Sequence, residues 1–252
     1  MRSLVFLDLD DTLFQSHRKC PTEGDLHPAA YLADGSAHSF MTTRQRSLWR
    51  LLEDQATLIP TTARDHDALR RVDLPFKSWR IIDYGGVILN PEGEPEGDWM
   101  ERMAAHSRDS LDELNALLDR MLTFVAREGL AIRARLIEDF GVPFYLVAKY
   151  RDECESDLDR LQYELAVPWV TERAGTHRLH RNSNNLAIIP GWLGKEWAVR
   201  HLIERLGREW GELLTIGIGD SLIDGAFMAE CDYAITPRGS QLFEATLSRV
   251  LI

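Results

Sequence analysis

Residues 6–14 read FLDLDDTLF, an apolar run that ends in closely spaced carboxylates. Ser3 to Leu7 has the pattern of a buried parallel strand. Because side chains alternate along a strand, Asp8 and Asp10 at its end project to the same side. At a separation of about 4 Å and an effective dielectric of about 20, two such carboxylates repel by roughly 4 kcal/mol. The pair therefore favours a divalent cation or a shared proton, although a solvated turn or a helix cap explains it when it stands alone.

A second acidic group, Asp220 and Asp224, follows a predicted buried strand at residues 213–218. A glycine turn at Gly219 with a helix cap explains this group equally well when it stands alone. Parallel strands, however, bring their carboxyl ends to one edge of a sheet, where ligands of open α/β folds bind. The two acidic groups together therefore predict a site for a hard cation with oxygen ligands, most naturally Mg²⁺.

Strands alternate with helices around these acidic groups, which favours an α/β fold with a parallel sheet. The predicted strands of this part are residues 3–7, 57–62, 80–83, 213–218 and 233–235. Helices are predicted after the capping box of Thr42 and Gln45, over 68–71, from Lys195 to Gly207, and over 221–230. The polar stretch that holds Pro21, Gly24, Pro28 and Gly35 shows no such pattern.

The middle of the chain has a different pattern. Apolar residues recur at helical spacing over residues 100–125, and Gly129 supplies a stop. The remaining predicted elements here are antiparallel strands at 130–136 and 144–150, a helix from Ser156, and segments 169–173 and 177–180 on either side of a turn at Gly175. We therefore predict a doubly wound, Rossmann-like parallel-sheet core, residues 1–84 plus 188–252, with an inserted α+β unit, residues 85–187.

Composition limits the class of protein. The chain has 252 residues, 44% hydrophobic and 27% charged, an ordinary globular mixture that excludes a disordered, collagen-like or disulfide-rich protein. Its 29 basic against 40 acidic residues give a net charge of −11, which disfavours nucleic acids and anionic membranes as partners. Cys20, Cys154 and Cys231 lie far apart, so neither a disulfide framework nor a zinc cluster is indicated. The first apolar run is too short for a signal peptide or a membrane span, so we expect a cytoplasmic protein.

The order of these chemical groups along the chain resembles the haloacid dehalogenase (HAD) superfamily of phosphotransferases. FLDLDDTLF resembles its first motif, TTAR at residues 61–64 its second, Lys195 its third, and IGIGDSLIDGAFM at residues 216–228 its fourth. The insertion between the second and third motifs resembles the type IIB cap of Cof-like, sucrose-phosphate and mannosyl-3-phosphoglycerate phosphatases. Asp11, Glu196 and Ile223 depart from residues common in Cof-like members, which blurs the subfamily.

The resemblance implies an enzyme, a Mg²⁺-dependent phosphoric monoester hydrolase. Its substrate would be a small phosphorylated metabolite, a phosphosugar or a sugar-acid phosphate. Asp8 would be the nucleophile that forms an aspartyl phosphate, and Asp10 the general acid and base. The implied metal ligands are Asp8, the Asp10 main-chain carbonyl, Asp220 and Asp224, and the implied phosphate ligands are Thr62, Arg64 and Lys195.

The resemblance also assigns recognition of the leaving group to the cap. The polar segment 180–185 offers donors to a sugar or a second anion, and we expect Arg181, Asn182 and Asn184 to bind substrate, against the alternative of a solvated loop. Within TTAR, Thr61 competes with Thr62 for the phosphate-binding role, and the likeness of TAR to the usual TGR favours Thr62.

Other functions stay open at this stage. A phosphosugar mutase of the phosphomannomutase type shares this cap and nucleophile. A receiver-like regulatory domain also combines acidic residues, Thr and Lys around Mg²⁺, and a catalytically silent phosphate-binding protein would keep the same fold. The sequence does not indicate an oligomeric state or a particular substrate.

Overall fold

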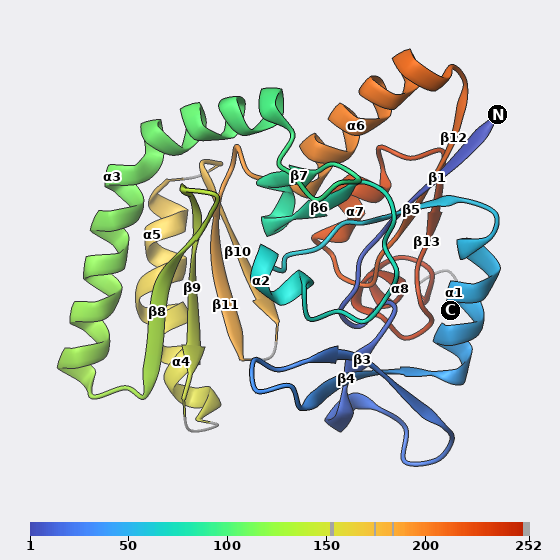
Figure 1. Ribbon diagram of the computed structural model, residues 1–252. Coiled ribbons are helices and arrows are strands. Elements are labelled where there is room, and N and C mark those ends of the chain that lie inside the picture. Colours follow the sequence, from blue (N-terminus) through green and yellow to red (C-terminus); the bar gives the residue numbers. More distant parts are fainter. Residues whose placement is uncertain (152–153, 174, 183, 249–252) are drawn as a thin grey trace. The chain divides into compact units, whose positions relative to one another are not determined.

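The computed structural model describes residues 1–151, 154–173, 175–182 and 184–248 (Figure 1). The chain divides into two compact units, which we call the core unit (Met1–Glu96 with Gly194–Ile252) and the inserted unit (Gly97–Leu193). The predicted insertion at residues 85–187 differs from the inserted unit at both ends. Residues 85–96, which the prediction assigned to the insertion, belong to the core unit, and Gly85 among them packs against the backbone at Gly194.

The core unit is built on a parallel sheet with the strand order β13-β12-β1-β5 (Figure 1). Its strands are β1 (Arg2–Leu7), β5 (Thr57–Pro60), β12 (Leu213–Ile218) and β13 (Tyr233–Ile235). β1 lies between β12 and β5, in a register that pairs Leu7 with Ile218 on one side and with Pro60 on the other. Leu4 to Leu7 are fully buried, as expected for the continuously apolar part of a central strand. The predicted α/β class with a parallel sheet is confirmed.

Helices and a hairpin also belong to the core unit. They are α1 (Thr43–Glu53), α2 (His66–Leu69), α6 (Lys195–Trp210), α7 (Asp224–Met228), α8 (Gln241–Ala245), the short helical turns η1 (His17–Lys19) and η2 (Asp83–Gly85), and the hairpin strands β6 (Arg80–Ile82) and β7 (Val87–Leu89). The predicted capping box is present, since the Thr42 hydroxyl accepts a hydrogen bond from the Gln45 amide at 3.3 Å and Gln45 Oε1 accepts one from the Thr42 amide at 2.9 Å. The predicted end of α6 at Gly207 is wrong. The helix continues to Trp210 and ends before Gly211, which adopts the left-handed conformation with φ 80°.

A small antiparallel sheet lies in the polar stretch where the sequence showed no pattern. Its strands are β2 (Gln15–Ser16), β3 (Leu26–Tyr31) and β4 (Ala37–Thr42), in the order β2-β4-β3. Pro28 is tolerated because β3 is an edge strand, and the pairing shifts register just after it. This irregularity breaks the period-two pattern that identifies a strand, although Ala29, Ala30 and Met41 are buried.

The inserted unit is an antiparallel sheet packed against helices, in the order β10-β11-β9-β8. Its elements are α3 (Gly97–Glu128), β8 (Ile132–Asp139), β9 (Val142–Tyr150), α4 (Glu155–Leu161), the π-helical turn η3 (Gln162–Ala166), α5 (Val167–Glu172), β10 (His177–Asn182) and β11 (Asn185–Pro190). The predicted long helix and the first two strands are confirmed. Trp169, expected to flank a turn, instead lies in α5 with its ring buried in the core of this unit. No helix among the described residues is long and apolar enough to cross a membrane.

Candidate active site

The carboxyl ends of β1 and β12 bring three carboxylates together. The Asp8 amide donates a hydrogen bond to the Ile218 carbonyl at 2.8 Å, which aligns the residues that follow the two strands. Carboxylate oxygens of Asp8, Asp220 and Asp224 lie within 4.8 Å of one another. Asp8 of the first acidic group and both carboxylates of the second, far apart in the sequence, therefore lie in one cluster, as the parallel topology predicts.

The turn after β12 lets Asp224 approach this cluster closely. A Cβ at Gly219 would lie 2.5 Å from Cβ of Asp224, so only glycine fits there without displacing it. α7 begins at Asp224, later than the predicted start at Ser221. Residue 221 instead orients the carboxylate, because its amide and its hydroxyl donate to Asp224 Oδ2 at 3.0 and 2.5 Å. The Thr12 hydroxyl donates to Asp220 at 3.3 Å.

Lys195 is the first residue of α6 and reaches the cluster from the other side. Its Nζ donates to Asp8 Oδ1 at 2.6 Å and to Asp224 Oδ1 at 2.7 Å, and the side chain is 3% exposed. The β6–β7 hairpin supports the backbone here. Gly85 has φ +94°, and a Cβ on it would lie 2.4 Å from the Gly194 carbonyl oxygen. Glycine at this turn therefore allows the close packing that places Lys195.

The charges of the cluster do not balance. Burial raises the pKa of Asp8 well above its usual range and outweighs the opposing effect of Lys195. Burial, followed by the charge of Asp224, raises the pKa of Asp220 to about 7. Burial opposes ionisation of both Asp224 and Lys195, but their mutual attraction dominates, so the pKa of Asp224 is lowered and that of Lys195 is raised. Three carboxylates facing one ammonium leave an excess of negative charge, and hard oxygen donors of this kind fit Mg²⁺.

Asp10 lies apart from this buried cluster. Its side chain is 43% exposed, against 8% for Asp8. Arg64 holds both of its oxygens, with Nε 2.7 Å from Oδ2 and Nη2 2.8 Å from Oδ1. Burial would lower the pKa of the Arg64 guanidinium, but its hydrogen bonds to Asp10 and the charge of that residue raise it overall. The sequence led us to expect that Arg64 binds phosphate. In the structure its guanidinium instead forms a bidentate ion pair with Asp10.

The two threonines of the second motif use their hydroxyls differently. Thr61 is fully buried, and its hydroxyl donates to the Ile59 carbonyl at 3.1 Å. The Thr62 hydroxyl accepts a hydrogen bond from the Arg64 amide at 3.2 Å. An acceptor hydroxyl keeps its own hydrogen for another partner, so Thr62 is the one that can still donate.

The cap residues singled out in the sequence lie at the end of the β10–β11 hairpin. Arg181 Nη2 lies 3.6 Å from Glu155 and 3.3 Å from Asp159, both in α4, so its charge is compensated within the inserted unit. Asn182 ends β10 and Asn184 lies in the turn before β11. Ser183, which belongs to the same polar segment, lies outside the described residues.

The inserted unit carries a basic surface that was not predicted from the sequence. Directly opposite strand residues share a face, and the register pairs Arg133 with Lys149 and Arg135 with Val147. The row continues through Ala187 to His180. The opposite face carries Leu146 and Ile188, which pack in the core of this unit with its helices.

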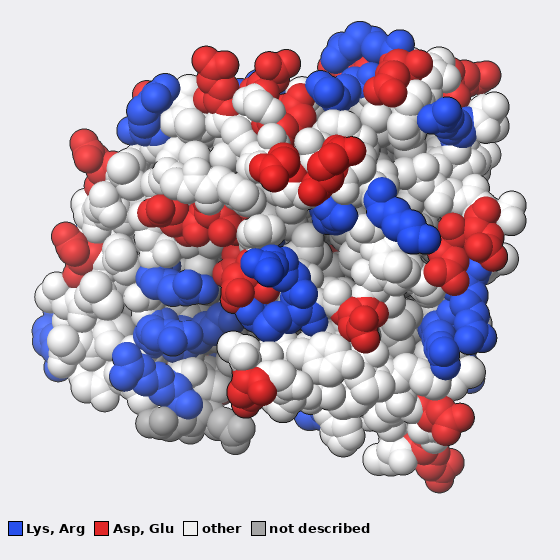
Figure 2. All heavy atoms as spheres, in the orientation of Figure 1, with Lys and Arg blue, Asp and Glu red and all other residues white. Residues whose placement is uncertain are grey.

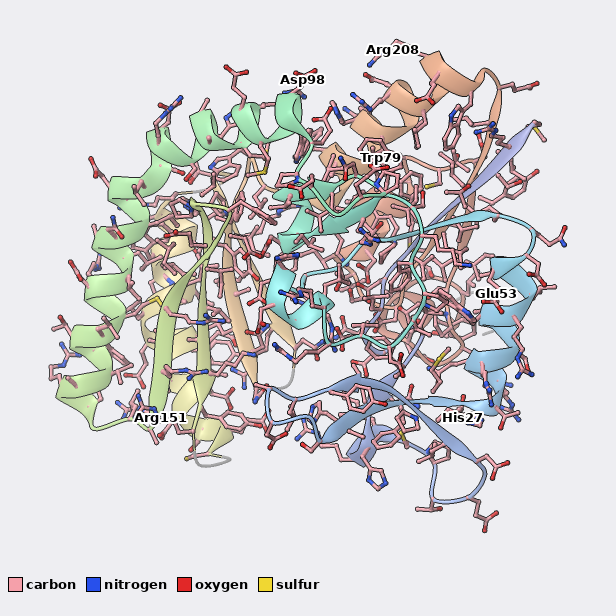
Figure 3. All side chains as sticks on the ribbon, in the orientation of Figure 1. His27, Glu53, Trp79, Asp98, Arg151 and Arg208 are labelled. Atoms are coloured by element: carbon pink, nitrogen blue, oxygen red, sulfur yellow. The ribbon has the colours of Figure 1, made fainter. Side chains whose placement is uncertain are left out.

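Arg133, Arg135, Lys149 and His180 therefore define a basic sheet face turned away from the helices. Figure 2 shows Lys and Arg side chains gathered over β8 and β9, and Arg151, labelled in Figure 3, follows directly after β9. The alternation of isoleucine, arginine, alanine, arginine and leucine over 132–136 is the signal that could have revealed this face, once the strand register was known.

The fold of this chain is similar to that of several solved structures, although its sequence matches no protein-family model. No curated protein sequence matches it either. Solved structures do match. Sucrose-phosphatase from Synechocystis, solved with sucrose and phosphate, is 17% identical over 99% of this chain and 88% of its own, with a TM-score of 0.52. The C-terminal domain of C. albicans trehalose-6-phosphate phosphatase is 14% identical over 90% of this chain and 72% of its own, with a TM-score of 0.55.

A nucleotidase has the same fold. The IMP-nucleotidase of Plasmodium falciparum, solved with IMP, is 12% identical, and the match covers 99% of this chain and 68% of that chain with a TM-score of 0.54. At these identities the similarity concerns the fold, and the three structures are described as two phosphatases and a nucleotidase.

Proposed function

We propose that this chain, which has the fold of the HAD-type phosphatases, is a Mg²⁺-dependent phosphoric monoester hydrolase acting on a small phosphorylated metabolite. The observation that carries the proposal is the buried cluster in which Lys195 contacts Asp8 and Asp224 beside Asp220. Phosphoryl transfer by an aspartate needs a nucleophilic carboxylate, a nearby positive charge and further oxygen donors. The cluster supplies the carboxylates at the carboxyl ends of parallel strands and the ammonium at the start of α6.

Asp8 is the nucleophile in this proposal. Its carboxylate oxygen forms a bond to phosphorus while the bond from phosphorus to the ester oxygen breaks, and Asp10 gives its proton to the departing oxygen. Water then attacks the aspartyl phosphate and Asp10 takes a proton from it, so that inorganic phosphate leaves and both aspartates are restored. Asp10 suits this exchange because it is the half-exposed member of the pair.

Phosphate carries negative charge and would be repelled by the carboxylates alone. Asp8, the Asp10 main-chain carbonyl, Asp220 and Asp224 would hold Mg²⁺, which offsets this charge when bound. Lys195 adds a fixed positive charge beside Asp8. Thr62 donates its hydroxyl hydrogen to a phosphate oxygen, a role open to it because its oxygen serves only as an acceptor for Arg64.

In this proposal the protein is cytoplasmic. Its substrate is a phosphosugar or a sugar-acid phosphate. Two of the matching structures are phosphatases of sugar phosphates by their descriptions, which supports this substrate class by analogy. The basic sheet face of the inserted unit favours a ligand that carries an anionic group or many hydroxyls, which supports the same choice of substrate.

A phosphate-release screen over phosphorylated metabolites tests the proposal, run with Mg²⁺ and with EDTA, and with the Asp8→Asn variant as control. We expect release that requires Mg²⁺, is lost in Asp8→Asn, and leaves label on residue 8 when a radiolabelled substrate is quenched in acid. Equal release by both proteins, each purified to the same standard, would reject Asp8 as the nucleophile. A requirement for a sugar bisphosphate would identify a mutase instead.

A further inference from the structure

Arg64 is held in place on several sides. Beyond its two hydrogen bonds to Asp10, its Nη1 donates to the Ala68 carbonyl at 3.3 Å, and its guanidinium carbon lies 5.2 Å from the centre of the Phe14 ring. The Arg64 side chain is 16% exposed. Burial, a backbone anchor and a ring contact leave this side chain little freedom, so the guanidinium acts as a fixed fork.

Asp10, unlike Arg64, is half-exposed and lies in an irregular part of the chain. It follows the end of β1 in an irregular loop, where Asp11 adopts φ 62° and the chain turns back to bridge Asp10 with Phe14. Lys195 fixes Asp8 and Asp224, whereas the bidentate contact with Arg64 fixes Asp10. A half-exposed carboxylate on a loop samples several rotamers unless a partner selects one. The planar fork of Arg64 selects both the position and the plane of this carboxylate.

We propose that Arg64 is a positioning residue that orients the Asp10 carboxylate toward the leaving-group oxygen. The inference rests on the proposed function, and it assigns Arg64 a role through Asp10 in place of the direct phosphate contact expected from the sequence. Proton transfer demands a donor within hydrogen-bond reach and in line, so loss of orientation alone lowers the rate. The guanidinium need not touch substrate for this effect.

Aryl phosphates distinguish a residue that serves only proton delivery to the leaving group from one that supports the whole reaction. Departure of 4-nitrophenolate needs little help from an acid because the leaving group is a weak base, whereas phenolate from phenyl phosphate needs more. Both esters have the same phosphoryl group and nearly the same size. A residue that serves only proton delivery therefore affects phenyl phosphate more than 4-nitrophenyl phosphate.

The experiment measures kcat/KM for both esters with the full chain and Mg²⁺, in wild type, Arg64→Gln, Asp10→Asn and the double variant. We expect Arg64→Gln to lower the value for phenyl phosphate on the order of a hundredfold and that for 4-nitrophenyl phosphate less than about tenfold. Adding Arg64→Gln to Asp10→Asn should cost no more than about twofold, since both changes remove one function. Arg71→Gln, which breaks an exposed ion pair with Asp67 near α2, is the matched control and should match wild type.

Several outcomes decide the matter. Equal losses on both esters, or losses that multiply in the double variant, would overturn the positioning role while leaving the proposed function intact. Inactivity of the wild type on every ester would overturn the proposed function and this role with it. Should Arg64→Gln fail to fold, Arg64→Lys gives the same test, because it keeps the charge and loses the fork. Its loss should again be larger on phenyl phosphate.

Discussion

The cluster at the strand ends of the core unit and the basic sheet face of the inserted unit are opposites in physical terms. In the cluster, Lys195 forms short ion pairs with the buried carboxylates of Asp8 and Asp224, which come from distant parts of the chain. On the basic sheet face, Arg133, Arg135 and Lys149 are exposed on regular strands, and like charges stand directly opposite each other. Desolvation makes the partners of the Lys195 ion pairs depend strongly on one another in the first region, whereas water screens exposed charges in the second. Substitutions should therefore have large effects in the cluster and small ones on the face.

The largest effect is expected from Asp8→Asn. An amide cannot attack phosphorus as a carboxylate does, so turnover of 4-nitrophenyl phosphate should fall by about 10⁴-fold or more. The variant should keep its fold, because asparagine has nearly the shape of aspartate, and far-UV circular dichroism checks this. Turnover close to that of wild type in a purified, correctly folded variant would remove Asp8 from the mechanism.

Lys195→Met tests whether the cluster depends on the positive charge of Lys195. Removing one partner of a buried ion pair leaves the other charges uncompensated, which commonly costs about 3–5 kcal/mol. We expect a loss of that size in the free energy of unfolding, measured with urea at neutral pH in EDTA. Lys19→Met is the matched control, since Lys19 pairs with Asp11 at the surface and should change stability by less than about 1 kcal/mol. Equal losses in both variants would contradict the comparison.

Thr62→Ala and Thr61→Ala separate the two hydroxyls of the second motif. Loss of one preorganised donor to the phosphate costs on the order of 3 kcal/mol of transition-state stabilisation, about a hundredfold in kcat for Thr62→Ala. Thr61→Ala removes a buried hydrogen bond to the Ile59 carbonyl, so it should lower stability by about 1 kcal/mol and leave kcat within about threefold. The reverse pattern would assign the phosphate contact to Thr61.

Much of the cluster could be predicted from the sequence because phosphate chemistry restricts its residue types and parallel strands bring their ends to one edge. The strand before Asp8 and the strand before Gly219 needed only their apolar runs to be recognised. The partner of Arg64 could not be predicted, because the motif places it near the phosphate but does not state which carboxylate its fork meets.

The basic sheet face and the β2-β4-β3 sheet were missed for a related reason. Their identity depends on which residues of different strands stand opposite each other, and a single strand does not contain that register. Pro28 and the register shift beside it also disturb the local pattern. The end of α6 was misplaced at Gly207, because a glycine inside a helix and one that ends it look alike until the backbone angle is known.

Asp220 contributes to the pH dependence of the metal-free cluster near neutral pH. Burial and Asp224 raise its pKa to about 7, above the unfolded value of about 3.9, so the folded chain binds a proton here more tightly than the unfolded chain. The stabilisation is present at low pH and is lost as the pH rises through about 7. In EDTA, Asp220→Asn should therefore gain stability relative to wild type between pH 5 and pH 8, by on the order of 2 kcal/mol. Parallel unfolding curves for the two proteins over this range would show that Asp220 does not titrate in the fold.

The double variant Arg133→Gln, Arg135→Gln probes the basic sheet face, where the smallest effect is expected. The charges are exposed, so kcat/KM for an anionic substrate should fall less than about tenfold, and the deficit should shrink as salt is added because ions screen such charges over about 10 Å. Stability should change by less than about 1 kcal/mol, because exposed charges contribute little to it. Arg120→Gln, on α3, removes a charge from the helix that packs on the other side of the sheet and serves as control. A salt-independent loss of a hundredfold would mean that these arginines bind substrate in a desolvated setting, and the face would then belong with the cluster rather than stand in contrast to it.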